Sequence, residues 1–512
     1  MTEDVVIAGA GPNGLMLACE LSLAGVRPTV LDRLPGRTQE NRANGLVGQV
    51  VRALDRRGLY ERLSGSAEPP RPSPAFVFGA MPLDLSRLGD NSMYGLPVPQ
   101  RRIEQVLEER ALELGVEIRR GHELTGLSQD EDGVTAEIAG PGGGYRLRSR
   151  YLVGADGGHS VTRKLCGIGF PGVTRDGSTS RGGHVTVPAE LIDPVTGGLN
   201  VPGYGPIPPF MHHRTDHGLF VYAPFPTGTL VHTTEWNENG DDQPMSLDEL
   251  RRSIRRVLGA DLPIGPPEGE GPHQLRRLTG GNTRLAERFR DHRVLLLGDA
   301  AHVHSAIGGP GLNLGLQDAI NLGWKLAAEI HGWAPPGLLD SYETERRPAA
   351  ERVVMHTQAQ SALIAPGPEV TALRALFGEL LRDERTVKHI ADLMSGADIR
   401  YDLEGSHPLT GRPAPDLVLE TETGSVRLAE LTRTARPLLL DLTPGAALAG
   451  ALHGRHDRVG LVTAKPGREG LPTALLLRPD CYVAWASDSP NPDMKELDTL
   501  RAALASAFGT AR

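Results

Sequence analysis

The chain opens with a short apolar run followed by a helical pattern of apolar positions. Residues 5–8 are apolar and end at Gly9, which predicts a buried strand. Between residues 14 and 24 apolar side chains recur at the spacing of one helix face, and a glycine ends that pattern. A second apolar run, residues 29–31, closes on Asp32. This strand–helix–strand order predicts a parallel sheet.

The pattern changes twice further along the chain. Between about residues 174 and 278, short β-rich pieces alternate with Pro and Gly turns, which indicates an inserted, mainly antiparallel domain. Residues 312–330 then show an apolar face at helical spacing, and helical patterns continue to about residue 393. From about residue 406, strand and helix patterns alternate again. The tail is therefore expected to form a separate small α/β domain.

Composition narrows the classes of function. The 512 residues are enough for about three domains at ~100–200 residues each. A net charge of −9 without a basic run argues against nucleic-acid binding, and the chain lacks a run of ~18 apolar residues that would predict a membrane span. The acidic N-terminus does not resemble a signal peptide. Three distant cysteines without a Cys-x-x-Cys pair favour a reduced cytoplasmic protein over a disulfide framework or a metal site.

The first candidate motif is a glycine string between the predicted strand and helix. Residues 9–14 are Gly-Ala-Gly-Pro-Asn-Gly, and Asp32 follows roughly 20 residues later. Gly9 permits a tight turn, Gly11 lets the backbone approach a pyrophosphate, and Gly14 lets the helix pack closely on the strand. The helix N-terminus presents N–H groups to phosphates, and the acid can accept from a ribose hydroxyl. The motif predicts a dinucleotide cofactor but does not separate FAD from NAD.

Two further acids and a second glycine loop extend this picture. Asp156 within residues 152–163 and Asp299 within residues 294–302 each follow an apolar strand, where an acid can accept from hydroxyls of an extended cofactor. Residues 308–313, Gly-Gly-Pro-Gly-Leu-Asn, open the long predicted helix. Its positive N-terminus would stabilise negative charge on a reduced flavin. Ordinary strand-end acids and a plain glycine loop are the alternatives.

These motifs, in this order, resemble those of the flavoprotein hydroxylases that include para-hydroxybenzoate hydroxylase and phenol hydroxylase. The chain is most similar to the aromatic-polyketide hydroxylases of angucycline and anthracycline pathways, and more distantly to rifampicin monooxygenase. Residues 322–327 (Leu-Gly-Trp-Lys-Leu-Ala) and 339–348 (Leu-Asp-Ser-Tyr-Glu-Thr-Glu-Arg-Arg-Pro) also look like this family. The resemblance covers essentially the whole chain, including the tail.

The resemblance implies an α/β fold. It comprises a Rossmann-like, GR2-type FAD-binding domain, an inserted antiparallel-sheet substrate domain and a C-terminal thioredoxin-like domain. The expected boundaries are 1–173 for the first part of the FAD-binding domain (with 71–100 contributing to the substrate domain), 174–278 for the substrate-binding domain, 279–400 for the second part of the FAD-binding domain and its long helices, and 401–512 for the tail.

The resemblance also implies which residues bind the cofactor. Asp32 and Arg33 would hold the adenosine ribose, and Leu124 would contact the adenine. Arg42 and Gln100 would lie along the ribityl and pyrophosphate portion. The complete expected set is Gly9, Gly11, Pro12, Asn13, Gly14, Asp32, Arg33, Arg42, Gln100, Leu124, Asp156, Asp299, Pro310, Gly311, Leu312 and Asn313.

Three positions depart from the family's pattern. Relatives often have Glu where Asp32 stands, and many have Pro and Gln where Ala306 and Pro310 stand. The last two positions flank the flavin in such enzymes, so the wall of the active site, and with it the substrate, is left open.

The implied reaction is hydroxylation of a bulky phenolic or polyketide aromatic substrate with O2 and NADPH or NADH. FAD is the expected bound cofactor, and NAD(P)H is a transient one because no second fingerprint is visible. The resemblance implies oxygen transfer through a C4a-hydroperoxyflavin. The alternatives are Baeyer–Villiger oxidation, epoxidation, antibiotic inactivation, a dioxygen-free flavin reductase and a non-catalytic flavin- or ligand-binding protein. A monomer and a homodimer are both compatible with the sequence.

The inserted domain is expected to roof the substrate cavity. Its candidate substrate contacts are Phe210, His213, Tyr222, Phe225 and His232, with core packing or an exposed loop as the alternative for each. Because the flavin performs the oxidation, no catalytic base is predicted. The histidines of this region lie without a paired carboxylate, which disfavours a metal site.

Overall fold

The predicted strand–helix–strand opening forms the centre of a largely parallel sheet. The computed structural model describes residues 2–38, 43–225, 228–236, 243–269, 273–421, 424–466 and 470–510. β1 (Glu3–Ala8) lies between β2 (Pro28–Asp32) and β10 (Gly143–Gly154) and runs parallel to both. β19 (Val294–Leu296) pairs in parallel with the far side of β10. The other strands of this eight-stranded sheet are β7 (Glu117–Arg120), β8 (Glu123–Gln129), β9 (Val134–Gly140) and β18 (Arg290–Asp291).

The register of these strands brings distant motifs to one edge. Ala8 pairs with Leu31 on one side and with Gly154 on the other, and Gly154 pairs with Leu296. The glycine string and the three acids that follow these strands therefore start from the same edge of the sheet. Ligands of open α/β sheets bind at the carboxyl ends of parallel strands, so this edge is where a cofactor site is expected.

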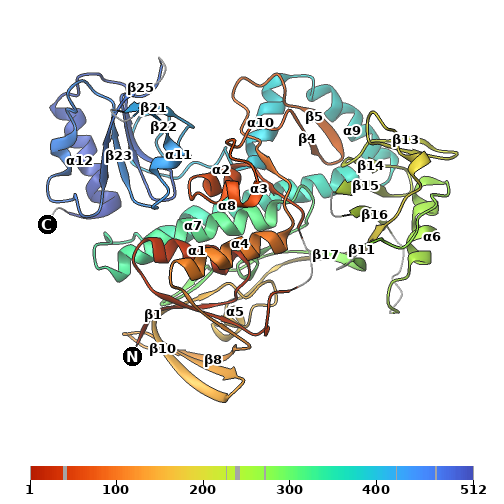
Figure 1. The fold of residues 1–512 in the computed structure, drawn as a ribbon, viewed down its shortest axis with the longest axis horizontal. Helices are drawn as coiled ribbons and strands as arrows, with labels where there is room; N and C mark the ends of the chain where they lie inside the picture. The colour runs from red at the N-terminus through yellow and green to blue at the C-terminus, as the bar shows by residue number, and fades with distance from the viewer. Residues whose placement is uncertain are drawn as a thin grey trace.

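Helices cover one face of the sheet (Figure 1). α1 (Pro12–Leu23) packs against α4 (Gln100–Glu113) and α7 (Pro310–Ile330). Because side chains alternate along β1, Val5 and Ile7 join the helical core, while the other face is closed by β8, β9 and β10. The remaining helices here are α2 (Gln49–Asp55), α3 (Tyr60–Ser64), α5 (Val161–Leu165), α8 (Ser341–Ile364), α9 (Pro368–Leu380) and α10 (Glu384–Ser395).

Within the described ranges, none of the helices combines the length and apolar character needed to cross a bilayer.

Short antiparallel pairs connect the first helices of the chain. They are β3 (Leu46–Val47) with β6 (Gly95–Leu96), and β4 (Ala75–Phe78) with β5 (Met81–Asp84).

The expected inserted antiparallel sheet lies beside the parallel sheet (Figure 1). Its order is β14 (His212–Arg214), β15 (Leu219–Phe225), β16 (Gly228–Trp236), β11 (Gly172–Val185), β17 (Leu275–Leu285) and β20 (His302–Val303). α6 (Leu247–Leu258), η1 (Ala189–Leu191) and the hairpin of β12 (Leu199–Val201) and β13 (Gly205–Ile207) accompany it. β20 follows the Asp299 turn, so this sheet is tied directly to the cofactor edge.

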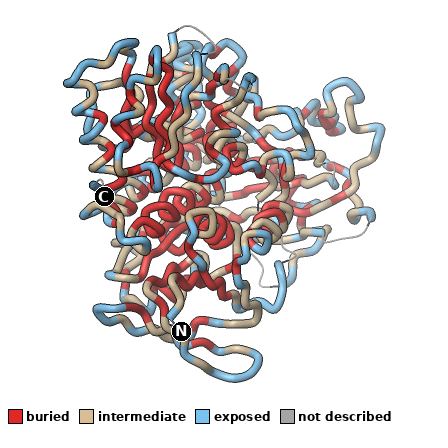
Figure 2. The backbone as a smooth tube through the Cα atoms, turned by 60° about the vertical axis from the view of Figure 1, so that its left-hand side comes forward, coloured by how far each residue is buried: buried red, intermediate tan, exposed pale blue. Residues whose placement is uncertain are grey.

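The tail forms the expected α/β domain. Its central sheet has the order β24 (Gly460–Thr463), β23 (Leu438–Asp441), β26 (Ala474–Leu477) and β27 (Val483–Ser487). Around it are β21 (Val418–Thr421), β22 (Gly424–Arg427), α11 (Leu428–Leu431), η3 (Ala449–Leu452), β25 (Lys465–Pro466) and α12 (Met494–Phe508). The buried core of this domain is continuous with that of α7, because Trp324 and Ala328 belong to its apolar cluster. Figure 2 shows the buried segments concentrated inside the molecule and the exposed ones at its periphery.

Candidate active site

A cavity of about 1020 Å³ lies at the shared edge of the parallel strands and reaches the inserted sheet. Most residues of the expected cofactor set line it. They are Gly9, Gly11, Pro12, Asn13, Asp32, Arg33, Gln100, Leu124, Asp156, Asp299, Gly311 and Leu312. Gly14, Pro310 and Asn313 lie outside this lining, and Arg42 lies outside the described residues.

The glycines of the first motif are required for different reasons. Gly9 has a φ of +114°, and a Cβ on it would lie 2.4 Å from the Ala155 carbonyl oxygen. A Cβ on Gly14 would lie 2.0 Å from the Gly9 carbonyl oxygen, so this glycine serves helix packing and lies outside the lining. Gly11 has no atom within 4 Å of its Cβ position and faces open space. The local folding therefore leaves bare backbone at the cavity.

Asn13 joins three glycine segments. A Cβ on Gly298 or on Gly315 would lie 2.2 Å or 2.3 Å from the Asn13 Nδ2 atom, so both glycines make room for this side chain. Asn13 lines the cavity, and its buried Oδ1 atom has no hydrogen-bond partner among the described residues. An unpaired buried acceptor costs free energy unless a ligand supplies a donor.

The acids at the strand ends are partly engaged by backbone. Asp32 accepts hydrogen bonds from the Ala10 N–H (2.9 Å) and the Leu34 N–H (2.8 Å), which fixes the turn after β1. Asp156 accepts from the N–H and the hydroxyl of Thr162 through Oδ2 (2.9 and 3.0 Å), while its buried Oδ1 lacks a partner within the described chain. One oxygen of Asp156 is therefore free for a ligand donor.

Helix N-termini supply positive charge at two places in the cavity. α1 starts after Gly11 and α7 after Gly309, and in the described structure neither start is capped by a hydrogen-bonded side chain. Asn313 instead fixes the second glycine loop, because it accepts from the Val47 N–H (3.0 Å) and donates to the Gly309 carbonyl (2.6 Å). Uncapped N–H groups and the helix dipole make such starts suitable for anionic groups.

Gln100 begins α4 at the side of the cavity, where its Nε2 donates to Glu104 Oε1 (2.8 Å). Asp299 lies on the short turn η2 (Gly298–Ala300), which Gly298 enters with a φ of +59°. His304 follows on the same side and lies against Gly311. From the sequence His304 is expected to be a loop residue beside the flavin rather than a metal ligand, because it lies four residues before the second glycine loop.

The end of the cavity under the inserted sheet is apolar. From this sheet and the turn before β14, the lining residues are Phe210, His212, Val221, Ala223, Phe225 and Leu230, and Phe76 and Val77 of β4 join them. The rings of Phe210 and Phe225 pack edge to face at 5.3 Å. Among the described lining residues of the inserted sheet, His212 has the only polar side chain.

Of the five candidate substrate contacts, Phe210 and Phe225 line the cavity and three residues do not. His213 and Tyr222 follow His212 and Val221 by one position, so strand alternation turns them away, and Tyr222 is fully buried in the core. His232 shares a face with Val221 but lies beyond the lining. Sequence reasoning missed His212 because the register of a three-residue strand is not visible in its pattern.

Burial favours the neutral form of three histidines in or beside the cavity, His212, His232 and His304. Burial lowers the pKa of His212, and it lowers the pKa of His232 to about 4, with His212 adding to the effect. Burial followed by the neighbouring His302 lowers the pKa of His304 to about 4. Neutral imidazoles can hydrogen-bond a phenol without fixing a charge in an apolar pocket.

The fold and this site define a dinucleotide-dependent oxidoreductase. A family model described as an FAD binding domain matches residues 2–357, and one described as aromatic-ring hydroxylase, C-terminal, matches residues 407–511. The chain therefore belongs to the FAD-dependent aromatic-ring hydroxylase family, and it is an FAD-dependent monooxygenase.

Known relatives match nearly the whole chain. The 12-dehydrotetracycline 5-monooxygenase/anhydrotetracycline 6-monooxygenase of Streptomyces rimosus subsp. rimosus is 44% identical over 95% of this chain and 96% of its own. A rifampicin monooxygenase of Streptomyces venezuelae is 40% identical over 97% of both chains. The structure of OxyS anhydrotetracycline hydroxylase from Streptomyces rimosus superposes with a TM-score of 0.87 at 41% identity, covering 100% of both chains.

The residues present fit FAD. Gly11 offers bare backbone, the α1 and α7 starts offer uncapped N–H groups, and Asn13 and Asp156 each keep a buried acceptor without a partner in the described chain. These features lie along one cavity, as an extended dinucleotide requires.

Proposed function

We propose that this monooxygenase hydroxylates a polycyclic phenolic substrate bound at the apolar end of the cavity. The observation that supports the proposal is the continuity of one cavity from the glycine string to the aromatic wall of the inserted sheet. In this proposal residues 174–278 act as the substrate domain, and the 71–100 segment contributes Phe76 and Val77. The similarity to tetracycline-pathway and rifampicin monooxygenases supports a large, fused-ring substrate.

The residues that would hold FAD follow from their positions. Asp32, Arg33 and Leu124 would hold the adenosine end. Gly11 and the start of α1 would hold the pyrophosphate, because its charge suits uncapped helix N–H groups. Asp299 would accept from ribityl hydroxyls. When bound, FAD supplies hydride acceptance from NAD(P)H and activation of O2.

The protein's own contribution is orientation and exclusion of water. Gly311 and Leu312 at the start of α7 place positive helix charge beside the cavity, which stabilises an anionic ring system there. The Phe210–Phe225 pair covers the aromatic face of the substrate and keeps water out. His212 hydrogen-bonds the phenolic hydroxyl and thereby sets which carbon of the ring lies nearest the flavin.

The decisive experiment offers purified holoenzyme a panel of polycyclic phenols with NADH or NADPH under ¹⁸O2. We expect substrate-stimulated oxidation of the nicotinamide and a product that gains one labelled oxygen as a ring hydroxyl. Nuclear magnetic resonance of the product separates a ring hydroxyl from the lactone of a Baeyer–Villiger reaction and from an epoxide. Nicotinamide oxidation that yields only hydrogen peroxide across the panel would refute the proposal.

A further inference from the structure

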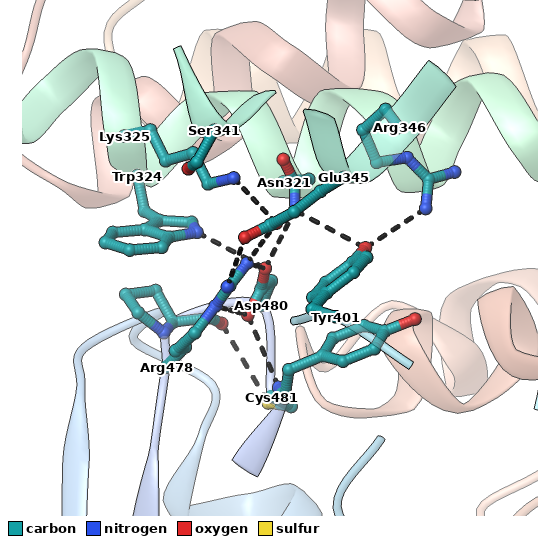
Figure 3. Close-up of polar contacts among 12 residues, drawn as sticks. Asn321, Trp324, Lys325, Ser341, Glu345, Arg346, Tyr401, Arg478, Asp480 and Cys481 are labelled. Atoms are coloured by element: carbon teal, nitrogen blue, oxygen red, sulfur yellow. Dashed lines mark hydrogen bonds and ion pairs between the residues drawn. The ribbon is translucent and has the colours of Figure 1, made fainter. Parts of the chain in front are cut away.

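The C-terminal domain contacts the FAD-binding domain through the loop between β26 and β27. Arg478 in this loop donates to both carboxylate oxygens of Glu345 on α8, at 2.7 Å each (Figure 3). Asp480 accepts from Asn321 (3.2 Å) and from the Trp324 indole (3.3 Å) of α7. These side chains are buried, with Glu345 the more exposed of the Arg478–Glu345 pair at 8%, and Trp324, Glu345 and Arg478 also line a neighbouring cavity, so the junction is a buried polar network beside that cavity.

Basic and acidic side chains are paired in this junction. Lys325 of α7, whose pKa burial lowers to about 7, lies 2.6 Å from Glu345, so two basic groups, Lys325 and Arg478, face two acidic groups, Glu345 and Asp480. A buried charge that loses its partner is costly. The network therefore specifies one seating of the tail on α7 and α8.

Tyr401 connects this junction to the next residue of α8. It belongs to the segment between α10 and β21, its ring stacks on Tyr482 at 4.0 Å, and Arg478 lies over it at 4.9 Å. Its hydroxyl accepts from Arg346 Nη1 (3.1 Å) and from Asn321 Nδ2 (3.4 Å) (Figure 3). The seating of the tail thus fixes one side of the Arg346 guanidinium.

The other side of Arg346 fixes Asp318, which is fully buried on α7. Arg346 Nε donates to Asp318 Oδ1 (2.8 Å), and its Nη2 donates to the Leu314 carbonyl (3.3 Å). The second oxygen of Asp318 accepts from the Gly298 N–H (3.2 Å) and lies 2.6 Å from His302 Nε2. A continuous buried chain therefore runs from the tail to the turn η2.

The turn at the end of this chain faces the cavity. Gly298 begins η2 with a left-handed backbone, and the next residue, Asp299, lines the cavity. The ring of His302 stacks parallel to that of His304, which also lines the cavity. Asp318 itself does not line the cavity, and it contacts Gly298 and His302, the residues next to and stacked on those that do.

We infer that Asp318 is a positioning residue for the FAD-binding turn and that the C-terminal domain contributes to FAD affinity through Tyr401 and Arg346. The same contacts could serve stability alone, in which case changing them would weaken folding without changing FAD affinity. FAD binding separates the two roles, because a stabilising contact common to the free and bound forms cancels in the dissociation constant.

The test measures FAD dissociation constants of the folded full-length protein by flavin fluorescence. Tyr401→Phe removes only the hydroxyl that Arg346 uses and keeps the stacked ring, and we expect it to weaken FAD binding about three- to tenfold. Asp318→Asn should weaken binding further. The double variant should bind no more weakly than Asp318→Asn alone, because both changes interrupt one chain.

Tyr151→Phe is the matched control, since this tyrosine is buried on β10 and its hydroxyl, among the described residues, donates to Glu329 at 3.5 Å, away from the chain that leads to Asp318. It should leave the FAD dissociation constant unchanged. If Asp318→Asn fails to fold, the Tyr401→Phe value decides alone. A Tyr401→Phe protein that melts at a lower temperature but binds FAD as tightly as the unchanged protein would overturn the inference. Additive losses in the double variant would also overturn it.

Discussion

Cys481 adopts a backbone conformation that suits glycine. It has a φ of +60°, is 2% exposed, and lies in the loop that seats the tail on α7. A left-handed conformation costs a residue with a Cβ about 1–2 kcal/mol. Asp480 accepts hydrogen bonds from the Arg478 side chain and the Tyr482 N–H on either side of Cys481, so these contacts keep the loop in a locally strained conformation.

Replacing this cysteine separates backbone strain from sulfur contacts. Cys481→Gly removes both the Cβ and the sulfur, whereas Cys481→Ala removes the sulfur and keeps the strain. We expect the glycine variant to be more stable than the alanine variant by about 1 kcal/mol, measured as a higher melting temperature of the holoenzyme. The opposite order would mean that the cavity left by the Cβ outweighs the relief of strain.

His212 and His213 are adjacent histidines with different environments, which gives a matched pair of variants. His212→Leu removes the polar group of the inserted-sheet wall, and we expect KM for a phenolic substrate to rise about three- to tenfold, since one neutral hydrogen bond is lost. The His213 side chain lies outside the cavity lining and is hydrogen-bonded to the Tyr204 hydroxyl, so His213→Leu should leave KM unchanged. Steady-state kinetics with one substrate checks both. A larger effect at His213 would contradict the assignment.

At the scale of single elements, the turn between β1 and α1 contains one glycine required for packing, Gly9, and one expected to be required for FAD binding, Gly11. Gly9→Ala would place a methyl group 2.4 Å from the Ala155 carbonyl oxygen at a positive φ, so we expect a loss of stability of roughly 2 kcal/mol or more. Gly11→Ala meets open space, so the apoprotein should keep its stability within about 0.5 kcal/mol.

FAD binding should show the reverse ranking. A methyl group on Gly11 stands where a pyrophosphate approaches the backbone, and we expect FAD affinity to fall about tenfold or more. Thermal melting of the apoprotein and titration with FAD check the two halves separately. Unchanged FAD affinity in Gly11→Ala would show that the cofactor does not approach this turn.

Elements set by local pattern could be predicted from the sequence. Short apolar runs and glycine spacing located β1, α1 and β2, and the acids after two further apolar runs indicated Asp156 and Asp299 as cofactor contacts. In the structure the parallel pairing of these strands brings both acids to the edge of the glycine string. Contacts that depend on register could not be located this way. His212 rather than His213 faces the cavity because of a one-residue register in β14, and nothing in a three-residue strand encodes it.

Long-range polar chains were also beyond sequence reasoning. Asp318 and Arg346 are 28 residues apart, and Arg346 and Tyr401 are 55 apart. Each looks locally like an ordinary helix or loop residue. Only the packing of α7, α8 and the tail brings the three together, and tertiary contacts of this kind leave no periodic signal.

At the scale of the whole molecule, buried neutral histidines should make stability depend on pH. Burial lowers the pKa of His232, His304 and His356 to about 4. In the unfolded chain these groups titrate near 6.5. As the pH falls from about 6.5 to 4, the unfolded state binds protons that the folded state does not, so stability decreases over this window.

We therefore expect the free energy of unfolding to fall between about pH 6.5 and 4, by up to ~1.4 kcal/mol per pH unit for each histidine, and the melting temperature to fall with it. His356→Gln, at a buried position, should reduce the slope of the unfolding free energy against pH. His389→Gln, at an exposed position, should leave that slope unchanged. Equal slopes in all three proteins would show that other groups control acid stability.

α7 contributes both to the cavity and to the core of the tail: its first turn lies at the cavity, and Trp324 and Ala328 further along belong to the core of the tail. The tail is therefore not an independent cassette. Replacing the tail with that of a relative would require exchanging the face of α7 that packs on it. Removing the residues after Leu403 would expose apolar surface of α7 and leave Lys325 and Glu345 without Arg478.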